Sequence, residues 1–178
     1  MLLALAALAG ALSLLPPSTA LAQPAGPVPP PSTGLNSSTT AAPDSSTSRS
    51  DLVVLTGAQE APGLGDPDGS GWFGYGLSLS HRVLCYGLTV EDIAPPTAAH
   101  IHIAPPGVPG PIVVTLDTPS DGDSSGCIRA VPDTAQTPAN ATLVLTESEL
   151  TGIATNPGAY YANVHNGEFP AGAVRGQL

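Results

Sequence analysis

Short runs in which apolar and polar residues alternate fill the chain from about residue 51, and clusters of Gly, Pro, Asp and Ser separate them. Successive side chains of a strand point to opposite faces, so this alternation predicts half-buried strands. We expect strands over 52–56, 72–79, 83–90, 99–103, 111–116, 141–145, 159–165 and 173–178, and a weaker one near 127–131. Turn residues about every ten positions favour antiparallel connections, which predicts an all-β domain.

Eight or nine short antiparallel strands with one apolar face each are typical of a two-sheet Greek-key sandwich, and a closed barrel is the second expectation. One short helix is expected over 147–154. Thr146 precedes it and Glu149 follows three residues later, which is the spacing of a capping box. The turn residues Asn156 to Gly158 then end it.

The N-terminal fifty residues differ from this pattern. Residues 2–15 form an apolar run that is too short to span a bilayer comfortably, and Ala20-Leu21-Ala22 resembles a cleavage site. We therefore expect residues 1–22 to be a signal peptide, with an uncleaved N-terminal anchor as the alternative. Residues 23–50 are rich in Pro, Ser and Thr and lack aromatic residues, which predicts a disordered spacer. The folded domain is then 51–178.

The chain is acidic, with a formal net charge of −10 at pH 7, and its four basic residues are all arginines. Such a surface repels phosphate, which argues against nucleic acid and anionic membranes as partners. The chain has two cysteines, Cys85 and Cys127. In an exported domain two cysteines usually pair, so a disulfide is expected, while two buried thiols or a shared metal are the alternatives.

Three of the four histidines lie on strand faces whose backs are apolar. His100 and His102 share one face of the strand over 99–103. His165 shares a face with Tyr161 and Asn163, in a hairpin whose second strand is 173–178. Imidazole suits copper or zinc, so His100, His102 and His165 are candidate ligands of one metal if their strands are neighbours. A solvated polar face is the alternative.

The remaining candidates are His81 and Arg175. His81 lies between two apolar strands in Ser80-His81-Arg82, and we interpret it as a turn residue. Arg175 is the one basic residue near the acidic C-terminal end, where it would either guide a small anion to the histidines or be held by carbonyl or carboxylate oxygens.

Three segments together resemble the CHRD domain, the domain named for its occurrence in chordin. They are LTGAQEAP at 55–62, AAHIHIAPPGVPGPIVVTL from residue 98 and YYANVHNGEFPAGAVRGQL from residue 160. The resemblance runs from about residue 52 to the C-terminus, and the positions of Cys85 and Cys127 are similar to those of bacterial single-domain members. It implies an immunoglobulin-like β-sandwich and an exported protein.

The chain also resembles, more loosely, the copper–zinc superoxide dismutases, which are Greek-key β proteins with an HxH pair, a Val-His on another strand and a late arginine. His100, His102, His165 and Arg175 would fill these positions by analogy. A bridging histidine, a zinc loop and a fourth ligand have no counterpart in the sequence.

The sequence thus supports a secreted, periplasmic or cell-surface binding module with no membrane span in the mature chain. Its partner is an extracellular molecule or a metal ion, with copper held by the three histidines. The first alternative is a copper-dependent oxidoreductase similar to superoxide dismutase. The second is a metal-free structural or surface-interaction protein in which the histidines form hydrogen bonds.

Overall fold

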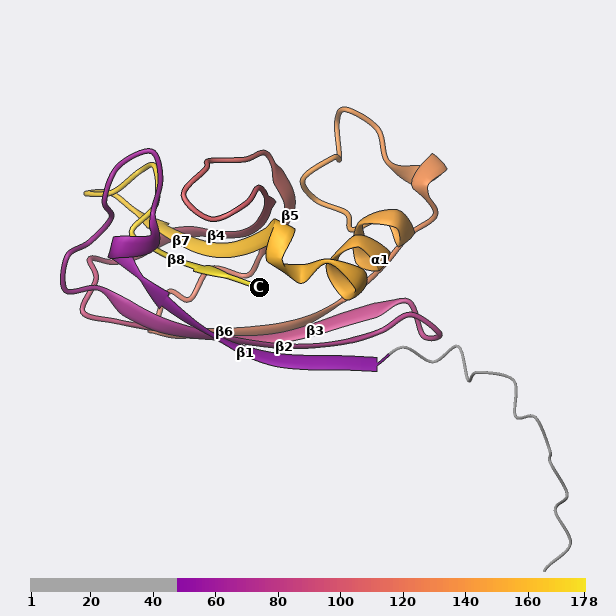
Figure 1. Ribbon diagram of the computed structural model, residues 1–178, viewed down its shortest axis with the longest axis horizontal. Coiled ribbons are helices and arrows are strands. Elements are labelled where there is room, and N and C mark those ends of the chain that lie inside the picture. Colours follow the sequence, from indigo (N-terminus) through magenta and orange to yellow (C-terminus); the bar gives the residue numbers. More distant parts are fainter. Residues whose placement is uncertain (1–47) are drawn as a thin grey trace, which may run out of the picture. The chain divides into compact units, whose positions relative to one another are not determined.

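The structure, a computed structural model, describes residues 48–178 (Figure 1). Eight strands, one α-helix and three short 3-10 helices follow one another along this part of the chain. The strands are β1 (Ser48–Thr56), β2 (Ser70–Ser78), β3 (Val83–Glu91), β4 (Pro96–Ile103), β5 (Ile112–Leu116), β6 (Asp123–Arg129), β7 (Tyr160–Asn166) and β8 (Val174–Gln177). The helices are η1 (Gly57–Gln59), η2 (Asp133–Ala135), α1 (Glu147–Thr155) and η3 (Pro157–Ala159).

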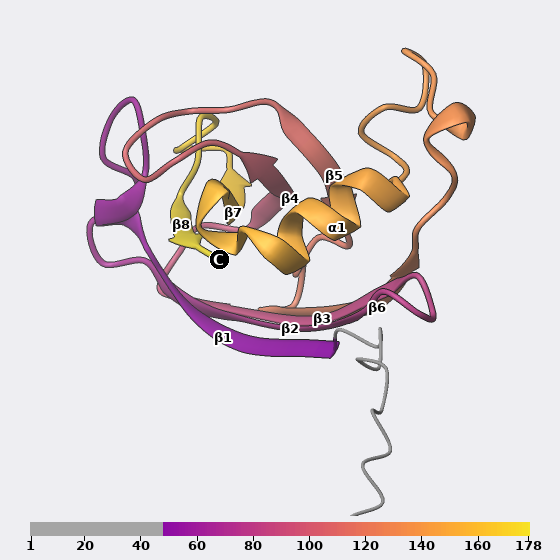
Figure 2. The same ribbon diagram turned by 45° about the vertical axis from the view of Figure 1, so that its right-hand side comes forward.

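All eight strands belong to one antiparallel sheet with the order β5-β4-β7-β8-β1-β2-β3-β6. The sheet folds over on itself, so that the half containing β4, β7 and β8 faces the half containing β1, β2, β3 and β6 (Figures 1 and 2). The halves are continuous through a single residue pair, Thr56 with Arg175. That pair is where the two halves of the sheet join.

The all-β class and the single short α-helix are confirmed. The sheet lies between the two architectures that the sequence favoured, because it is continuous like a barrel yet its edge strands β5 and β6 are not paired with each other. In both views α1 lies above the half that contains β1, β2, β3 and β6, next to the strands of the other half (Figures 1 and 2). The immunoglobulin-like Greek-key arrangement stays a prediction.

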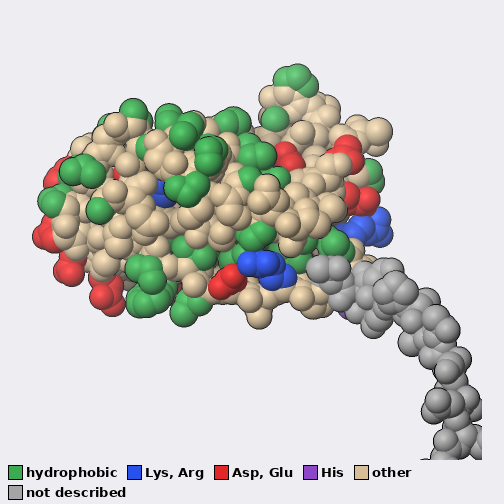
Figure 3. All heavy atoms as spheres, in the orientation of Figure 1, with side chains coloured by type: hydrophobic (Ala, Val, Ile, Leu, Met, Phe, Trp, Pro, Cys, Tyr) green, Lys and Arg blue, Asp and Glu red, His purple; other side chains and the backbone are tan. Residues whose placement is uncertain are grey.

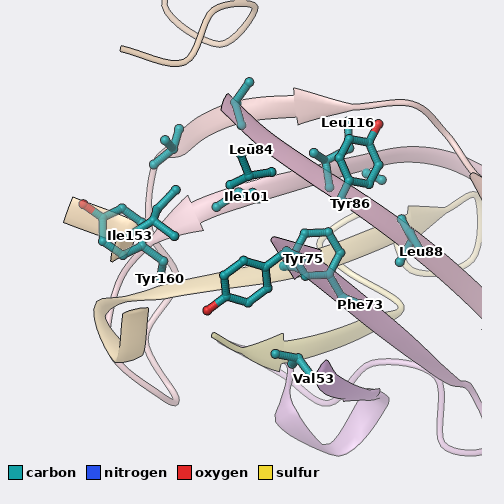
Figure 4. Packing of buried hydrophobic residues seen from close by; sticks show 14 of the residues in the cluster. Val53, Phe73, Tyr75, Leu84, Tyr86, Leu88, Ile101, Leu116, Ile153 and Tyr160 are labelled. Atoms are coloured by element: carbon teal, nitrogen blue, oxygen red, sulfur yellow. The ribbon is translucent and has the colours of Figure 1, made fainter. Parts of the chain in front are cut away.

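The alternation of side chains builds the core between the halves (Figure 4). Phe73, Tyr75 and Leu77 of β2 face inward and are almost fully buried. Helix α1 adds Leu150 and Ile153 to the same cluster. Because burial of one such side chain stabilises the fold by about 1.5–3 kcal/mol, the core fixes which face of every strand points inward.

Helix α1 begins where its cap predicts. The Thr146 hydroxyl accepts a hydrogen bond from the Glu149 N–H at 3.2 Å, and the Glu149 carboxylate accepts one from the Thr146 N–H at 2.8 Å. This is the expected capping box. Asn156 ends the helix, as expected.

The strand expected over 141–145 is wrong. The Asn140 side chain accepts hydrogen bonds from the Thr137 N–H and hydroxyl, and the N–H of Leu143 donates to the Asn140 carbonyl at 2.9 Å. These local bonds fold the segment into turns, which compete with strand formation. In this segment Leu145 is buried, while Leu143 is exposed. The strand pairing next to it is limited to one isolated bridge between Val131 and Thr146.

Strand β1 begins at Ser48, earlier than the strand expected over 52–56, because it pairs with the full length of β2. Residues 48–50 of the expected spacer are therefore in the sheet. The expected signal peptide at 1–22 and most of the expected spacer lie outside the described residues. Over residues 48–178, no helix combines the length and the apolar character that crossing a membrane requires.

Cys85 and Cys127 form the expected disulfide. They lie directly opposite each other on β3 and β6, so the bond ties the edge strand β6 to the sheet. In the described part of the chain no cysteine remains free.

Candidate metal centre

Strands β4 and β7 are neighbours, which is the condition that the histidine hypothesis required. In their register His102 lies opposite Tyr161, His100 opposite Asn163 and Ala98 opposite His165. The histidines occupy the face that points away from the core, while the next residue along β4, Ile101, is fully buried in it. The pairing of β4 with β7 therefore gathers three imidazoles on one outer face.

The three rings form a compact cluster. Their centroids are 5.0 Å apart for His100 and His165, 5.4 Å for His100 and His102, and 6.2 Å for His102 and His165. One ring nitrogen from each lies within 4.8 Å of the other two. Nitrogen ligands of one ion at about 2.0–2.1 Å lie closer together than this, so the rings would have to turn toward one another to hold an ion.

Backbone carbonyls hold two of these rings by their Nδ1 atoms. His102 Nδ1 donates to the Gly110 carbonyl at 2.9 Å, and His165 Nδ1 donates to the Pro170 carbonyl at 3.1 Å. A proton on Nδ1 leaves Nε2 of the same ring as a lone-pair donor, and such carbonyl contacts are the usual support of a metal-binding imidazole. Both rings are thus held in the tautomer that a metal needs.

The nitrogens that face one another lack partners. His100 Nδ1, His102 Nε2 and His165 Nε2 are buried and make no hydrogen bond within residues 48–178. Burial without a partner costs a polar atom about 1–3 kcal/mol, and native structures hold few such atoms. Three of them in one cluster form a group that could hold one metal ion.

The environment keeps the imidazoles neutral. Burial lowers the pKa of all three, and for His100 burial together with its two histidine neighbours lowers the pKa to about 4. Neutral imidazole is the form that binds a metal. At pH 7 no proton has to leave before an ion enters.

Tyr161 and Arg175 support the cluster from the side. The Tyr161 ring stacks on His102 with centroids 4.7 Å apart and planes 4° from parallel, and the Arg175 guanidinium carbon lies 3.4 Å from the Tyr161 centroid. The Tyr161 hydroxyl also accepts a hydrogen bond from the Gly110 N–H at 3.2 Å. The stack restricts how far the His102 ring can turn.

Arg175 is 1 % exposed, and its guanidinium donates to the carbonyls of Val108 and Pro105 and to the Gln177 side chain. This matches the second expectation for this residue, a guanidinium held by oxygens. The segment 104–110 that it anchors is the one that holds His102. His81 is exposed beside Ser78 in the turn between β2 and β3, and it takes no part in the histidine cluster.

The sequence did not suggest a functional role for two residues of this region, Asn163 and Glu60. Asn163 is 2 % exposed between His100 and Arg175, and its side-chain oxygen is unpartnered in the described structure. Glu60 is 8 % exposed and lies beside Asn163 and Arg175. Glu60 follows η1, where alternation gives no signal, so nothing in the sequence points to its burial.

On the face of the molecule that Figure 3 shows, acidic side chains gather mainly toward the two ends, with one acidic and one basic group near the lower middle. The groups that stack on the rings or bond to them, namely Tyr161 and the carbonyls of Gly110 and Pro170, are uncharged. The centre would therefore be a nitrogen-ligand site in mostly neutral surroundings.

These features define an all-β domain with a three-histidine cluster on one outer face. The chain belongs to the CHRD domain family, whose model matches residues 52–178, and the expected family is thereby confirmed. Comparison with curated proteins and with solved structures found no significant match.

Proposed function

We propose that this chain is an exported CHRD binding module that holds a copper ion through His100, His102 and His165. The observation that carries the proposal is the cluster of three buried imidazole nitrogens without hydrogen-bond partners. One ion would accept all three lone pairs and remove three desolvation costs at once. The two carbonyls on the Nδ1 atoms would then act as the outer support of the site.

Copper is favoured over zinc by the ligand set. The cluster offers nitrogen alone, without the thiolates of a structural zinc site, and affinity at such sites rises to copper in the divalent series. A site of three imidazoles leaves further coordination positions for water or for a group of a partner. His100 and His165 are half-buried, whereas His102 is 7 % exposed, so solvent would reach a bound ion from the side of His100 and His165.

Binding is favoured over a superoxide dismutase-like reaction because of Arg175. A guide for small anions needs a guanidinium that solvent can reach, whereas this one is 1 % exposed and already donates to three oxygens. We assign Arg175 a positioning role for the segment that carries Gly110.

Export follows from the apolar run at 2–15 and agrees with the disulfide, which forms in oxidising compartments. We propose cleavage before Gln23 and a spacer at 23–47 that leads into β1. The two halves of the folded sheet would correspond to the layers of an immunoglobulin-like Greek-key sandwich. N-terminal sequencing of the exported protein tests the cleavage, and recovery of Met1 would overturn it.

The copper proposal is tested on the full chain. The protein is loaded with Cu(II), dialysed and assayed for retained metal, while electron paramagnetic resonance reports nitrogen ligands. We expect one copper per chain with nitrogen hyperfine coupling. Replacement of His100, His102 or His165 by Ala should each weaken binding by about a hundredfold or more, since each removes one of three ligands.

His81→Ala is the matched control because it removes an exposed histidine from a turn outside the cluster. It should bind copper as the wild type does. If the histidines do not bind metal, the variant that lacks all three should retain as much copper as the wild type. That result would discard the site. Circular dichroism of each variant verifies that the sheet is retained.

A further inference from the structure

A cavity lies near the histidine cluster, between the loop after η1 and the loop between β7 and β8. It has a volume of about 150 Å³ and is lined by Glu60, Ala61, Gly63, Leu64, Glu168, Phe169, Pro170, Ala171 and Gly172. By this measure one water needs about 10–15 Å³, so the cavity has room for several waters or a short chain of heavy atoms. The metal proposal makes no use of this space.

The inner wall of the cavity carries a buried acid. Glu60 is 8 % exposed, whereas Leu64, Glu168 and Pro170 at the other walls are exposed. Arg175 and Asn163 lie near this carboxyl, but its Oε1 atom has no hydrogen-bond partner within the described residues, and the two ion pairs found there involve other acids. A buried carboxyl is rarely left unpaired, because its charged form loses hydration.

The fold makes room for this carboxyl by a glycine. Gly172 has φ +141°, and a side-chain carbon there would meet the carboxyl atoms of Glu60. The backbone at this point is one that other residues rarely adopt. The space for the Glu60 carboxyl is thus built into the loop between β7 and β8.

The chemistry of the walls selects a ligand class. Apart from the two acids, the lining is aliphatic or aromatic, and no arginine contributes to it. An unbranched alkyl chain would pack on Leu64 and Phe169, and a terminal ammonium would donate to the Glu60 carboxylate. Glu168 adds a second negative charge at the exposed wall, and the net charge of −10 attracts cations over longer distances.

We propose that this cavity binds a primary ammonium group on an unbranched aliphatic chain, such as a lysine side chain, with Glu60 as its counter-ion. The site is separate from the histidine cluster and does not depend on metal. The two are nevertheless connected, because Pro170 of the cavity wall accepts the hydrogen bond that holds His165.

The test is a titration of the full chain at pH 8 with n-butylammonium, followed by NMR of the backbone amides or by calorimetry. We expect saturable binding with shifts at residues 60–64 and 168–172. n-Butanol, which has the same chain without the charge, should bind at least about tenfold more weakly, since a charge-assisted hydrogen bond supplies that much. Equal binding of the two probes would overturn the proposal.

Three variants make the result specific. Glu60→Gln should weaken n-butylammonium by about tenfold or more, while Glu91→Gln, which removes the same charge from an exposed strand residue outside the cavity, should leave it unchanged. Ala171→Phe fills the exposed mouth without changing charge and should also abolish binding. If the two Gln variants weaken binding equally, the attraction is that of the whole acidic surface and the proposed site is wrong.

A peptide arm separates the two sources of the ammonium group. A short peptide with one internal lysine is compared with its norleucine counterpart and with free n-butylammonium. Tighter binding of the lysine peptide than of the free amine assigns the cavity to a protein partner, and the reverse order assigns it to a small amine. Absence of binding by every amine probe overturns the inference, and because all titrations use metal-free protein, it leaves the copper proposal unaffected.

Discussion

The Arg175 guanidinium carbon lies 3.4 Å from the centroid of the Tyr161 ring, and that ring stacks in turn on His102. Because β7 lies between β4 and β8, Tyr161 separates the arginine from the histidine. A buried cation thus acts on the candidate ligand through an aromatic ring and through the segment 104–110. The relationship makes Arg175 a structural part of the histidine face.

Replacement of Arg175 by Met should therefore reduce stability more than it reduces copper affinity. The variant loses three hydrogen bonds and the contact with Tyr161, and it leaves the Val108 and Pro105 carbonyls without their donor. We expect the free energy of unfolding to fall by about 2–4 kcal/mol. Urea denaturation measures the loss, and Arg175→Lys should recover part of it. A variant as stable as the wild type would contradict the positioning role.

The stability of the metal-free protein should depend on Glu60 and pH. Burial raises the pKa of Glu60 from 4.5 to about 7, so the folded state holds this proton more tightly than the unfolded state. The stability that protonation contributes is fully present below about pH 4.5 and is lost as the pH rises through about 7. The advantage of Glu60→Gln over the wild type should thus grow with pH, from almost nothing at about pH 4.5 to about 1–3 kcal/mol at pH 8.

Thermal denaturation at several pH values checks this expectation, with Glu91→Gln as the charge-matched control. The comparison between variants cancels the opposite contribution of the histidines. Their lowered pKa values give stability that is lost as the pH falls, and for His100 this loss runs down to about pH 4. The same pH dependence in both Gln variants would show that Glu60 is not the group responsible.

Gly172 and Glu60 should be coupled energetically. A methyl group at position 172 would occupy the space of the Glu60 carboxyl, and the φ of +141° is strained for alanine. Gly172→Ala should cost about 2–4 kcal/mol, and Glu60→Ala in the same chain should recover the steric part of it. A double-mutant cycle measures the coupling, and strictly additive effects would mean that the carboxyl lies elsewhere.

The disulfide should stabilise the domain by closing a long loop. Cys85 and Cys127 are 42 residues apart, so the chain-entropy account gives about 4 kcal/mol. The Cys85→Ser/Cys127→Ser double variant should lose about that much in denaturation experiments. Intact mass after alkylation without reductant should show no modified thiol in the wild type, and two modified cysteines would contradict the bond.

Local pattern predicted most of the strands and the capping box of α1, while the disulfide was expected from two cysteines in an exported domain. Alternation sets the buried face of a strand, because burial of apolar side chains is the largest favourable contribution to folding. The same pattern failed at 141–145, where apolar letters alternate but the hydrogen bonds of Asn140 form turns. Pattern also placed His100, His102 and His165 on polar faces without giving the distance between them.

Only the tertiary structure decided what those faces meet. The pairing of β4 with β7 brings the three histidines together across more than sixty positions of sequence. The contact of the segment 104–110 with β8 buries Arg175, and the loop after η1 places Glu60 near Arg175. These contacts depend on strand order and loop path, which are set by the global packing of the sheet. The sequence determined which side chains were available, and the fold determined which of them became neighbours.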